Sequence, residues 1–128
     1  MGIIMKAVFD TCILIDYLRG IQAARRELGL YEEKIISTIT FIETLVGAIT
    51  KEEDDVIRGF LSAFRVANLE TSIAERSIKI RKTHHLKVPD AIVYATAKEN
   101  GCLLVTRNTK DLKTEWPDIR VPYQLDRA

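Results

Sequence analysis

The sequence has little sulfur or imidazole and no long apolar run. No hydrophobic segment approaches the ~20 residues that a membrane-spanning helix requires, so we expect no membrane association. The two cysteines and two histidines do not have the spacing of a zinc site. Both Cys12 and Cys102 lie in apolar segments, which predicts reduced core thiols in a cytoplasmic protein. The opening residues MGIIMK lack the apolar core and the cleavage site of a signal peptide.

Neither sign of charge dominates the chain, and repeats, low-complexity tracts and linkers are missing. The 19 basic and 18 acidic residues give a formal net charge of +1. This balance argues against a protein held on nucleic acid by bulk charge alone, although it allows a local basic patch. A chain of 128 residues is long enough for one domain with a sizeable core, so we expect a single domain over residues 1–128.

The apolar pattern predicts strands that alternate with helices. Short β-rich runs occur at MKAVF, KIIST, VANLE, CLLVT and IRVPY. Helical patterns lie between them, at residues 12–19 and 21–31, TFIETLVGAIT, EEDDVIRGFLSAFR, TSIAERSIKIRKTHH and PDAIVYATAKENG. Such alternation is typical of an α/β fold with a mostly parallel central sheet and helices on both faces. In these folds ligands bind beyond the carboxyl ends of the strands.

Four acidic residues follow predicted strands or open the helices after them. They are Asp10, Glu43, Asp90 and Asp111. In a parallel sheet all four lie at one edge, where carboxylates repel one another unless a cation compensates their charge. Mg²⁺ and Mn²⁺ take oxygen ligands of this kind. The joint placement of these acids therefore indicates a divalent-metal site.

Each acid also has a purely structural interpretation. Asp10 could cap the helix that follows it, and Asp90, next to Pro89, could stabilise a helix dipole. The segment TFIE fits a capping box in which Glu43 reaches back to the backbone N–H of Thr40. Taken singly, the acids are better explained as caps. Only their number and common position favour the metal site.

Other charged residues allow two interpretations. Asp16 falls inside the first predicted helix, and we interpret it as a solvated residue or a partner of Arg19. The histidines at residues 84–85 end a helix that is rich in cations. These cations either stabilise the helix dipole or form a phosphate track that leads toward Asp90.

Three stretches resemble the PIN-domain nucleases, in particular the VapC-type toxins of prokaryotic toxin–antitoxin pairs. FDTCILIDYL resembles the first strand of that family and its continuation, and ISTITFIETLVGA resembles its glutamate motif. VPDAIVYATAKENGCLLVTRNTKDL resembles its third acid with the helix, strand and turn that follow. The motifs occur in the family's order and span nearly the whole chain.

The resemblance implies a hydrolase, a Mg²⁺- or Mn²⁺-dependent endoribonuclease, with Asp10, Glu43 and Asp90 as its core metal-site acids. Asp10 and Asp90 are expected to hold the ion most directly. The fourth position stays open, because Asp111 matches some members of the family and Asn108 stands where others have an acid.

The resemblance also implies roles for residues around the acids. Residues expected to orient the site are Thr11, Thr40, Thr106 and Asn108. From their charge and their position near the motifs, rather than from the resemblance, the cations expected to hold flanking phosphates are Arg81, Lys87, Arg107 and Lys110. Cys12 departs from the Ser, Thr or Asn that is usual at its position, which puts a hydroxyl contact there in doubt.

Three kinds of partner follow from the resemblance. They are an RNA substrate, a second copy of the chain in a homodimer, and a cognate antitoxin that lies in an apolar groove near the first helices. Residues 13–18 contain the apolar side chains that would line such a groove, although core packing explains Ile13, Leu14, Tyr17 and Leu18 equally well. Alternatives are a housekeeping PIN nuclease for RNA processing and a degenerate PIN module that binds RNA or protein without cutting.

Overall fold

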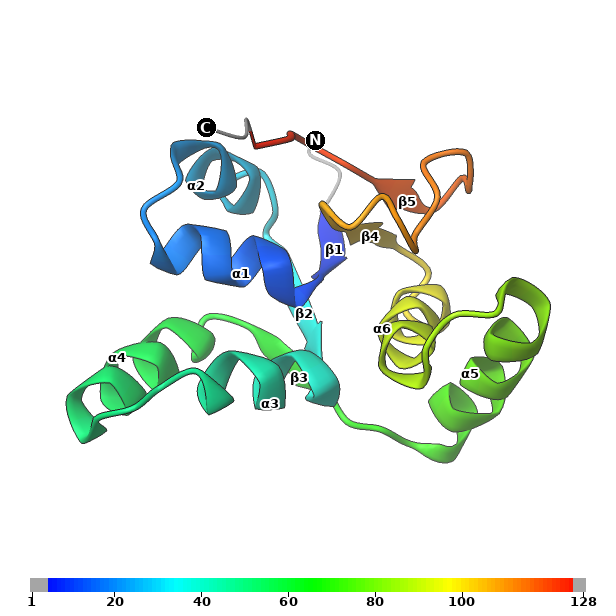
Figure 1. Ribbon diagram of the computed structural model, residues 1–128, viewed down its shortest axis with the longest axis horizontal. Helices are drawn as coiled ribbons and strands as arrows, with labels where there is room; N and C mark the ends of the chain where they lie inside the picture. The colour runs from blue at the N-terminus through cyan, green and yellow to red at the C-terminus, as the bar shows by residue number, and fades with distance from the viewer. Residues whose placement is uncertain (1–4, 126–128) are drawn as a thin grey trace.

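A five-stranded sheet organises the chain in the computed structural model, which describes residues 5–125 (Figure 1). The strands are β1 (Lys6–Phe9), β2 (Glu33–Ser37), β3 (Arg65–Ala67), β4 (Leu103–Val105) and β5 (Ile119–Arg120). The helices are α1 (Thr11–Leu18), α2 (Gln22–Leu28), α3 (Thr38–Val46), α4 (Lys51–Leu61), α5 (Thr71–His84) and α6 (Val88–Glu99).

The strand order is β3-β2-β1-β4-β5, and every neighbouring pair is parallel. The predicted α/β class is therefore confirmed, with a sheet that is fully parallel. The chain builds outward from β1 to β2 and β3, and then returns through α5 and α6 to place β4 on the other side of β1. This reversal makes the gap between the carboxyl ends of β1 and β4 the switch point, where α/β folds bind their ligands.

Two hydrophobic layers cover the sheet, because successive strand side chains point to opposite faces. Val8 of β1 belongs to the layer that contains the apolar residues of α5 and α6. Ala7 and Phe9 belong to the opposite layer, together with residues of α1, α2 and α4. Figure 1 shows these two sets of helices on the two sides of the strands. Burial on both faces explains why the strands have continuous apolar runs.

Element boundaries differ from the predicted ones at several places. The helix predicted from Thr40 begins at Thr38, because the Ser37 side chain accepts a hydrogen bond from the Ile39 backbone N–H at 3.0 Å and caps the helix. The final strand contains only Ile119–Arg120 of the predicted IRVPY run, which includes Pro122, a residue without an N–H for the ladder. At the end of α6, Gly101 adopts φ 63°, a left-handed conformation that favours glycine. Across residues 5–125, no helix is both long enough and apolar enough to cross a bilayer.

Candidate functional site

Asp10 lies at the switch point and is held from three sides. Its backbone N–H donates to the Val105 carbonyl at 2.9 Å, which continues the β1–β4 pairing. Its carboxylate caps α1 by accepting the Thr11 N–H at 2.9 Å and also accepts the Thr106 hydroxyl at 2.7 Å. Burial raises the pKa of Asp10, against these hydrogen bonds, and the nearby negative charge of Glu43 raises it further. Asp10 thus caps a helix and also belongs to the acid set, by which we mean Asp10, Glu43, Asp90 and Asp111.

Cys12 takes part in the same network through its sulfur. Its Sγ lies 3.8 Å from the Asp10 carboxylate and 3.8 Å from the Thr106 hydroxyl, and it accepts the Arg107 backbone N–H at 3.4 Å. Burial, followed by the charge of Asp10, raises the pKa of the thiol to about 11. At neutral pH the thiol is protonated and donates to Asp10. The sulfur therefore makes the contact for which a hydroxyl was in doubt.

Glu43 projects from α3 and is oriented by Thr11, whose hydroxyl donates to the Glu43 carboxylate at 2.6 Å. The predicted capping box at Thr40 is wrong, because α3 starts two residues earlier and Thr40 lies inside it. The Thr40 hydroxyl is buried and has no hydrogen-bond partner among residues 5–125. Thr11, rather than Thr40, makes the polar contact with Glu43.

Asp90 lies in the first turn of α6, within reach of the charges of the other three acids. Burial raises its pKa to about 6, and the negative charges of Asp10, Asp111 and Glu43 contribute in that order, while Lys87 opposes them. The other three acids singled out in the sequence therefore all act on Asp90. These charge interactions show that the four acids, which come from separate parts of the chain, lie in one region of the fold.

The turn after β4 brings Asn108 and Asp111 together. The Asn108 side-chain amide donates to the Asp111 carboxylate at 3.3 Å, and the Asp111 backbone N–H donates back to the Asn108 side-chain oxygen Oδ1 at 3.4 Å. The Asn108 backbone N–H donates to the Thr106 hydroxyl at 3.0 Å. Both candidates for the fourth position thus belong to one hydrogen-bonded turn that is connected to Asp10 through Thr106.

The chemistry of the acids fits a hard divalent cation, since their oxygens are its preferred ligands and the charge of Lys87 offsets only part of their mutual repulsion. Their geometry is not preformed. In the part of the chain that the structure describes, no group of three or more His, Cys, Asp or Glu residues is arranged to hold a metal ion. Hydrogen bonds from Thr106, Thr11 and Asn108 engage the carboxylates of Asp10, Glu43 and Asp111. An ion would have to move at least one of these side chains.

Asp16 is not solvated and does not pair with Arg19, so that prediction is wrong. It is 1% exposed and accepts two hydrogen bonds from the Arg107 guanidinium, at 2.8 and 2.9 Å, and one from the Tyr123 hydroxyl at 2.7 Å. Sequence reasoning missed this cluster because its members lie 91 and 107 positions apart. The only local signal was an acid within an otherwise apolar helix.

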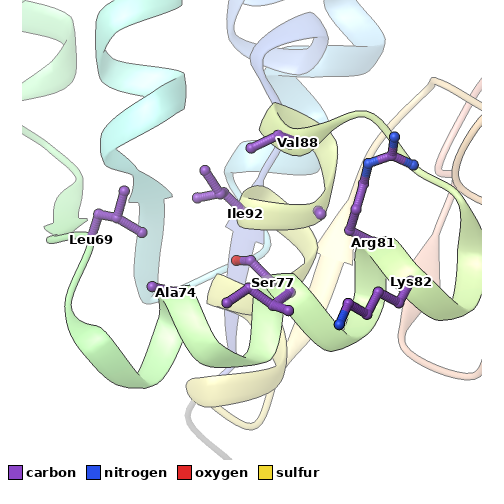
Figure 2. Close-up of a pocket in the computed structure, with 9 residues that line it drawn as sticks. Leu69, Ala74, Ser77, Arg81, Lys82, Val88 and Ile92 are labelled. Atoms are coloured by element: carbon purple, nitrogen blue, oxygen red, sulfur yellow. The ribbon is translucent and has the colours of Figure 1, made fainter.

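The four cations expected to contact phosphate have different surroundings. Arg107 is engaged by Asp16, whose hydrogen bonds raise its pKa. Lys87 is exposed next to the acid set, and its charge opposes the raised pKa of Asp90. Lys110 is exposed on the rim of a polar cavity of about 370 Å³, which Cys12 also lines. Arg81 lies instead along an apolar groove of about 280 Å³ between α5 and α6 (Figure 2).

The apolar residues of α1 divide between the core and the surface. Ile13 and Leu14 are fully buried, so the core interpretation holds for these two. Tyr17 is half-buried and stacks on Phe60 with ring centroids 4.5 Å apart. Leu18 is half-buried as well. Tyr17 and Leu18 are thus partly accessible from the surface, unlike Ile13 and Leu14.

Comparison with protein families identifies the domain. The chain matches the PIN domain over residues 7–115. It belongs to the PIN domain family. The motif resemblance noted in the sequence is therefore confirmed, and the match covers the three stretches on which it was based.

Solved structures place this PIN domain among proteins of toxin–antitoxin systems. A chain of a toxin–antitoxin complex from Klebsiella pneumoniae is 41% identical with a TM-score of 0.87, covering 93% of this chain and 99% of that one. A chain of DNA-bound VapBC from Salmonella typhimurium is 25% identical with a TM-score of 0.74, covering 91% and 96%. FitAcB from Neisseria gonorrhoeae, 22% identical with a TM-score of 0.75 over 93% and 99%, shares the fold. Among curated proteins nothing matches.

Proposed function

We propose that this PIN domain is a Mg²⁺- or Mn²⁺-dependent endoribonuclease and the toxin of a cytoplasmic toxin–antitoxin pair. The supporting observation is the grouping of four carboxylates at the switch point. Thr11 connects Asp10 to Glu43, and Thr106 connects Asp10 to the turn of Asn108 and Asp111. Burial and the charges of these carboxylates raise the pKa of Asp90. A folded protein tolerates such repulsion at a cost, and a divalent cation removes that cost. The sequence similarity to a protein of the Klebsiella pneumoniae toxin–antitoxin complex supports the biological role.

The residues of the site suggest a division of labour. Asp10, Glu43 and Asp90 would hold the ion, with Asp111 or Asn108 in the fourth position. When bound, a divalent ion supplies Lewis acidity toward the scissile phosphate and the attacking water. Thr106 and Thr11 keep the carboxylates of Asp10 and Glu43 oriented through their hydroxyl hydrogen bonds.

The substrate we propose is single-stranded RNA, whose splayed bases and flexible backbone can enter an open edge of a sheet. Lys87 and Lys110 are exposed near the acids and are suited to bind flanking phosphates. We assign no such contact to Arg107, because Asp16 engages its guanidinium. The proposed protein partners are an antitoxin and a second copy of the chain.

The proposal is tested by incubating purified protein with a single-stranded RNA and separating the products. We expect cleavage with Mn²⁺ or Mg²⁺, loss of cleavage in EDTA, and recovery when Mn²⁺ is restored. Intact RNA under all metal conditions would contradict the nuclease assignment. Expression alone should also arrest growth, and co-expression of the protein encoded next to it should relieve the arrest. A housekeeping nuclease would also cut RNA, but the protein encoded next to it would not inhibit the cleavage.

One observation favours a second candidate, the non-catalytic PIN module. Within residues 5–125 the acids do not form a ready metal-binding group. A module of this kind would retain RNA in a filter-binding assay and leave it uncut with and without Mn²⁺. The cleavage assay and the filter assay together therefore separate the two functions.

A further inference from the structure

The Asp16 cluster, formed by Asp16, Arg107 and Tyr123, connects three distant parts of the chain next to the acid set. Asp16 lies on α1, which begins directly after Asp10. Arg107 lies in the turn after β4, and Tyr123 lies in the segment after β5, which runs back toward α1 and α2 (Figure 1). A bidentate arginine–carboxylate pair fixes distance and orientation together. The cluster therefore sets the position of the β4 turn relative to α1.

That turn carries several groups that contact the acids. The Arg107 backbone N–H donates to Cys12, which in turn contacts Asp10. The residue before it, Thr106, donates its hydroxyl to Asp10, and the residue after it, Asn108, donates its amide to Asp111. Arg107 is thus the middle residue of a tripeptide in which every member is connected to the acid set.

We propose that Asp16, Arg107 and Tyr123 are positioning residues that hold the β4 turn against α1 and thereby set the affinity of the acid set for a divalent cation. This inference rests on the proposed function, because it concerns the same site. The three side chains do not bind the ion themselves. They act through Thr106, Asn108 and the backbone of Arg107.

The buried charge of Asp16 gives the cluster a second effect. The Asp16 carboxylate forms an ion pair with the Arg107 guanidinium, and the Arg107 side chain is only 28% exposed. Without that partner the guanidinium would be an unpaired cation on the turn whose neighbouring residues Thr106 and Asn108 contact Asp10 and Asp111, and its positive charge would oppose the binding of a metal ion there. Removing the Asp16 charge should therefore weaken metal binding more than removing one hydrogen bond to it.

The chain offers a matched control in the Glu27 cluster, formed by Glu27, Arg120 and Tyr31. Glu27 is 4% exposed, accepts two hydrogen bonds from Arg120 at 2.6 and 2.9 Å, and accepts one from the Tyr31 hydroxyl at 2.7 Å. The chemistry is the same, but the cluster joins α2 to β5. Its link to the site is the Arg120 carbonyl, which accepts the Thr106 N–H at 3.0 Å. Side-chain substitutions leave that backbone bond in place.

The experiment measures Mn²⁺ affinity of the full chain by isothermal titration calorimetry, with Mn²⁺ electron paramagnetic resonance as a second readout. The variants are Asp16→Asn and Tyr123→Phe, with Glu27→Gln and Tyr31→Phe as their controls. Residues that orient metal ligands change metal affinity by about 10- to 100-fold when they are removed. We expect a loss near the lower end of this range for Asp16→Asn, a smaller loss for Tyr123→Phe, and wild-type affinity for both controls.

Stability is measured in parallel, so that a merely structural role can be recognised. Each variant and its control remove the same chemical group from a buried carboxylate cluster, so both should lower the midpoint of urea unfolding. If Asp16→Asn does not fold, Tyr123→Phe and Arg107→Lys, which keeps the charge but not the bidentate geometry, give the same comparison.

Two results would overturn the inference, and only the second of them would also overturn the proposed function. Equal Mn²⁺ affinity in a folded variant of the Asp16 cluster and in its control would refute the positioning role while the nuclease proposal stands. Failure of the wild-type protein to bind Mn²⁺ would refute the proposed function, and with it the positioning role. Weaker binding confined to the Asp16 cluster supports the inference.

Discussion

The buried carboxylates of this protein have two different kinds of hydrogen-bond partner. Glu27 and Asp16 are each paired with an arginine and a tyrosine, and the hydrogen bonds from Arg120 and Tyr31 bring the pKa of Glu27 below its ordinary value although burial alone raises it. Asp10 is also buried, but its partners are the neutral Thr106, Thr11 and Cys12. Within residues 5–125, Glu27 and Asp16 therefore each form an ion pair with an arginine, whereas Asp10 at the switch point forms none.

This difference indicates what kind of partner the switch point is suited to. Leaving a carboxylate buried without a counter-ion costs stability, and adding further carboxylates nearby increases the cost. Glu27 and Asp16 show that this fold can place an arginine next to a buried carboxylate. Asp10 has no such arginine among its hydrogen-bond partners within residues 5–125. The uncompensated charge at the edge of the sheet is consistent with a cation supplied from solution.

The comparison is tested most strongly by Asp10→Asn. The substitution keeps the shape of the side chain and its ability to cap α1, but it removes a charge from the acid set. We expect RNA cleavage to fall to background while the circular dichroism spectrum stays native. Asp55→Asn, which changes an exposed acid of α4 paired with Lys51, is the matched control and should cut RNA at the wild-type rate. Wild-type cleavage by Asp10→Asn would show that the acid is only a cap.

The next largest effect is expected at the arginine-paired carboxylates. Glu27→Gln removes the charge that compensates Arg120 and should lower the free energy of unfolding by about 2 kcal/mol, as expected for lost hydrogen bonds to a charged group. The effect is smaller than for a fully buried ion pair, because the Arg120 side chain is 41% exposed and solvent screens its charge. Urea denaturation at pH 7 measures this change. An unchanged midpoint would show that Glu27 contributes nothing that a neutral amide cannot replace.

Neutralising an acid at the switch point should raise the free energy of unfolding, whereas Glu27→Gln should lower it. Burial and the charges of Asp10, Asp111 and Glu43 raise the pKa of Asp90 to about 6 from 3.8, so its ionised form disfavours the native state above pH 6. In metal-free buffer at pH 7, Asp90→Asn should therefore raise the free energy of unfolding by about 1–2 kcal/mol, after allowance for solvent screening.

The pH dependence distinguishes this effect from better packing. As the pH falls from 6 toward 3.8, Asp90 is protonated in the wild-type protein, the penalty disappears, and the two stability curves should converge. A constant difference between wild type and Asp90→Asn from pH 7 to pH 4 would contradict the electrostatic explanation.

The smallest expected effect is stabilisation by the cation itself. Mn²⁺ at a tenfold excess over its dissociation constant should raise the free energy of unfolding of the wild-type protein by about 1.4 kcal/mol, because it binds only the native state. Thermal melts with increasing Mn²⁺ measure the shift. Asp10→Asn should show a smaller shift, and an equal shift in both proteins would place the ion elsewhere.

Local patterns predicted the sheet, which the structure confirms, and they singled out the four acids, whose metal-binding role stays a prediction. Both interpretations depend on residues that are neighbours in the sequence. The apolar run before Asp10 gave the first strand, and Pro89 with Gly101 bracketed the last long helix. The start of α3 was misplaced because Ser37 and Thr40 are both good caps, and the choice between them depends on where β2 ends. Parallel pairing with β1 and β3 sets that end.

The Asp16 cluster could not be predicted in this way. Its three members lie on α1, after β4 and after β5, and only the parallel order of the strands brings them together. The same limit applies to Thr11 and Glu43, which are 32 positions apart. Contacts of this kind depend on tertiary structure, whereas the identity of the acids was visible in the motifs.

The central position of β1 has a consequence for how long the site persists. β1 is hydrogen-bonded on both sides, and the Asp10 amide is part of that pairing. Strands in such positions exchange their amide hydrogens only when the whole domain opens, unlike edge strands and loops, which fray on their own. The acid-bearing strand end should therefore survive every partial opening of the molecule. Silencing it reversibly would then require a molecule that covers the edge or removes its cation, rather than a local change in the fold.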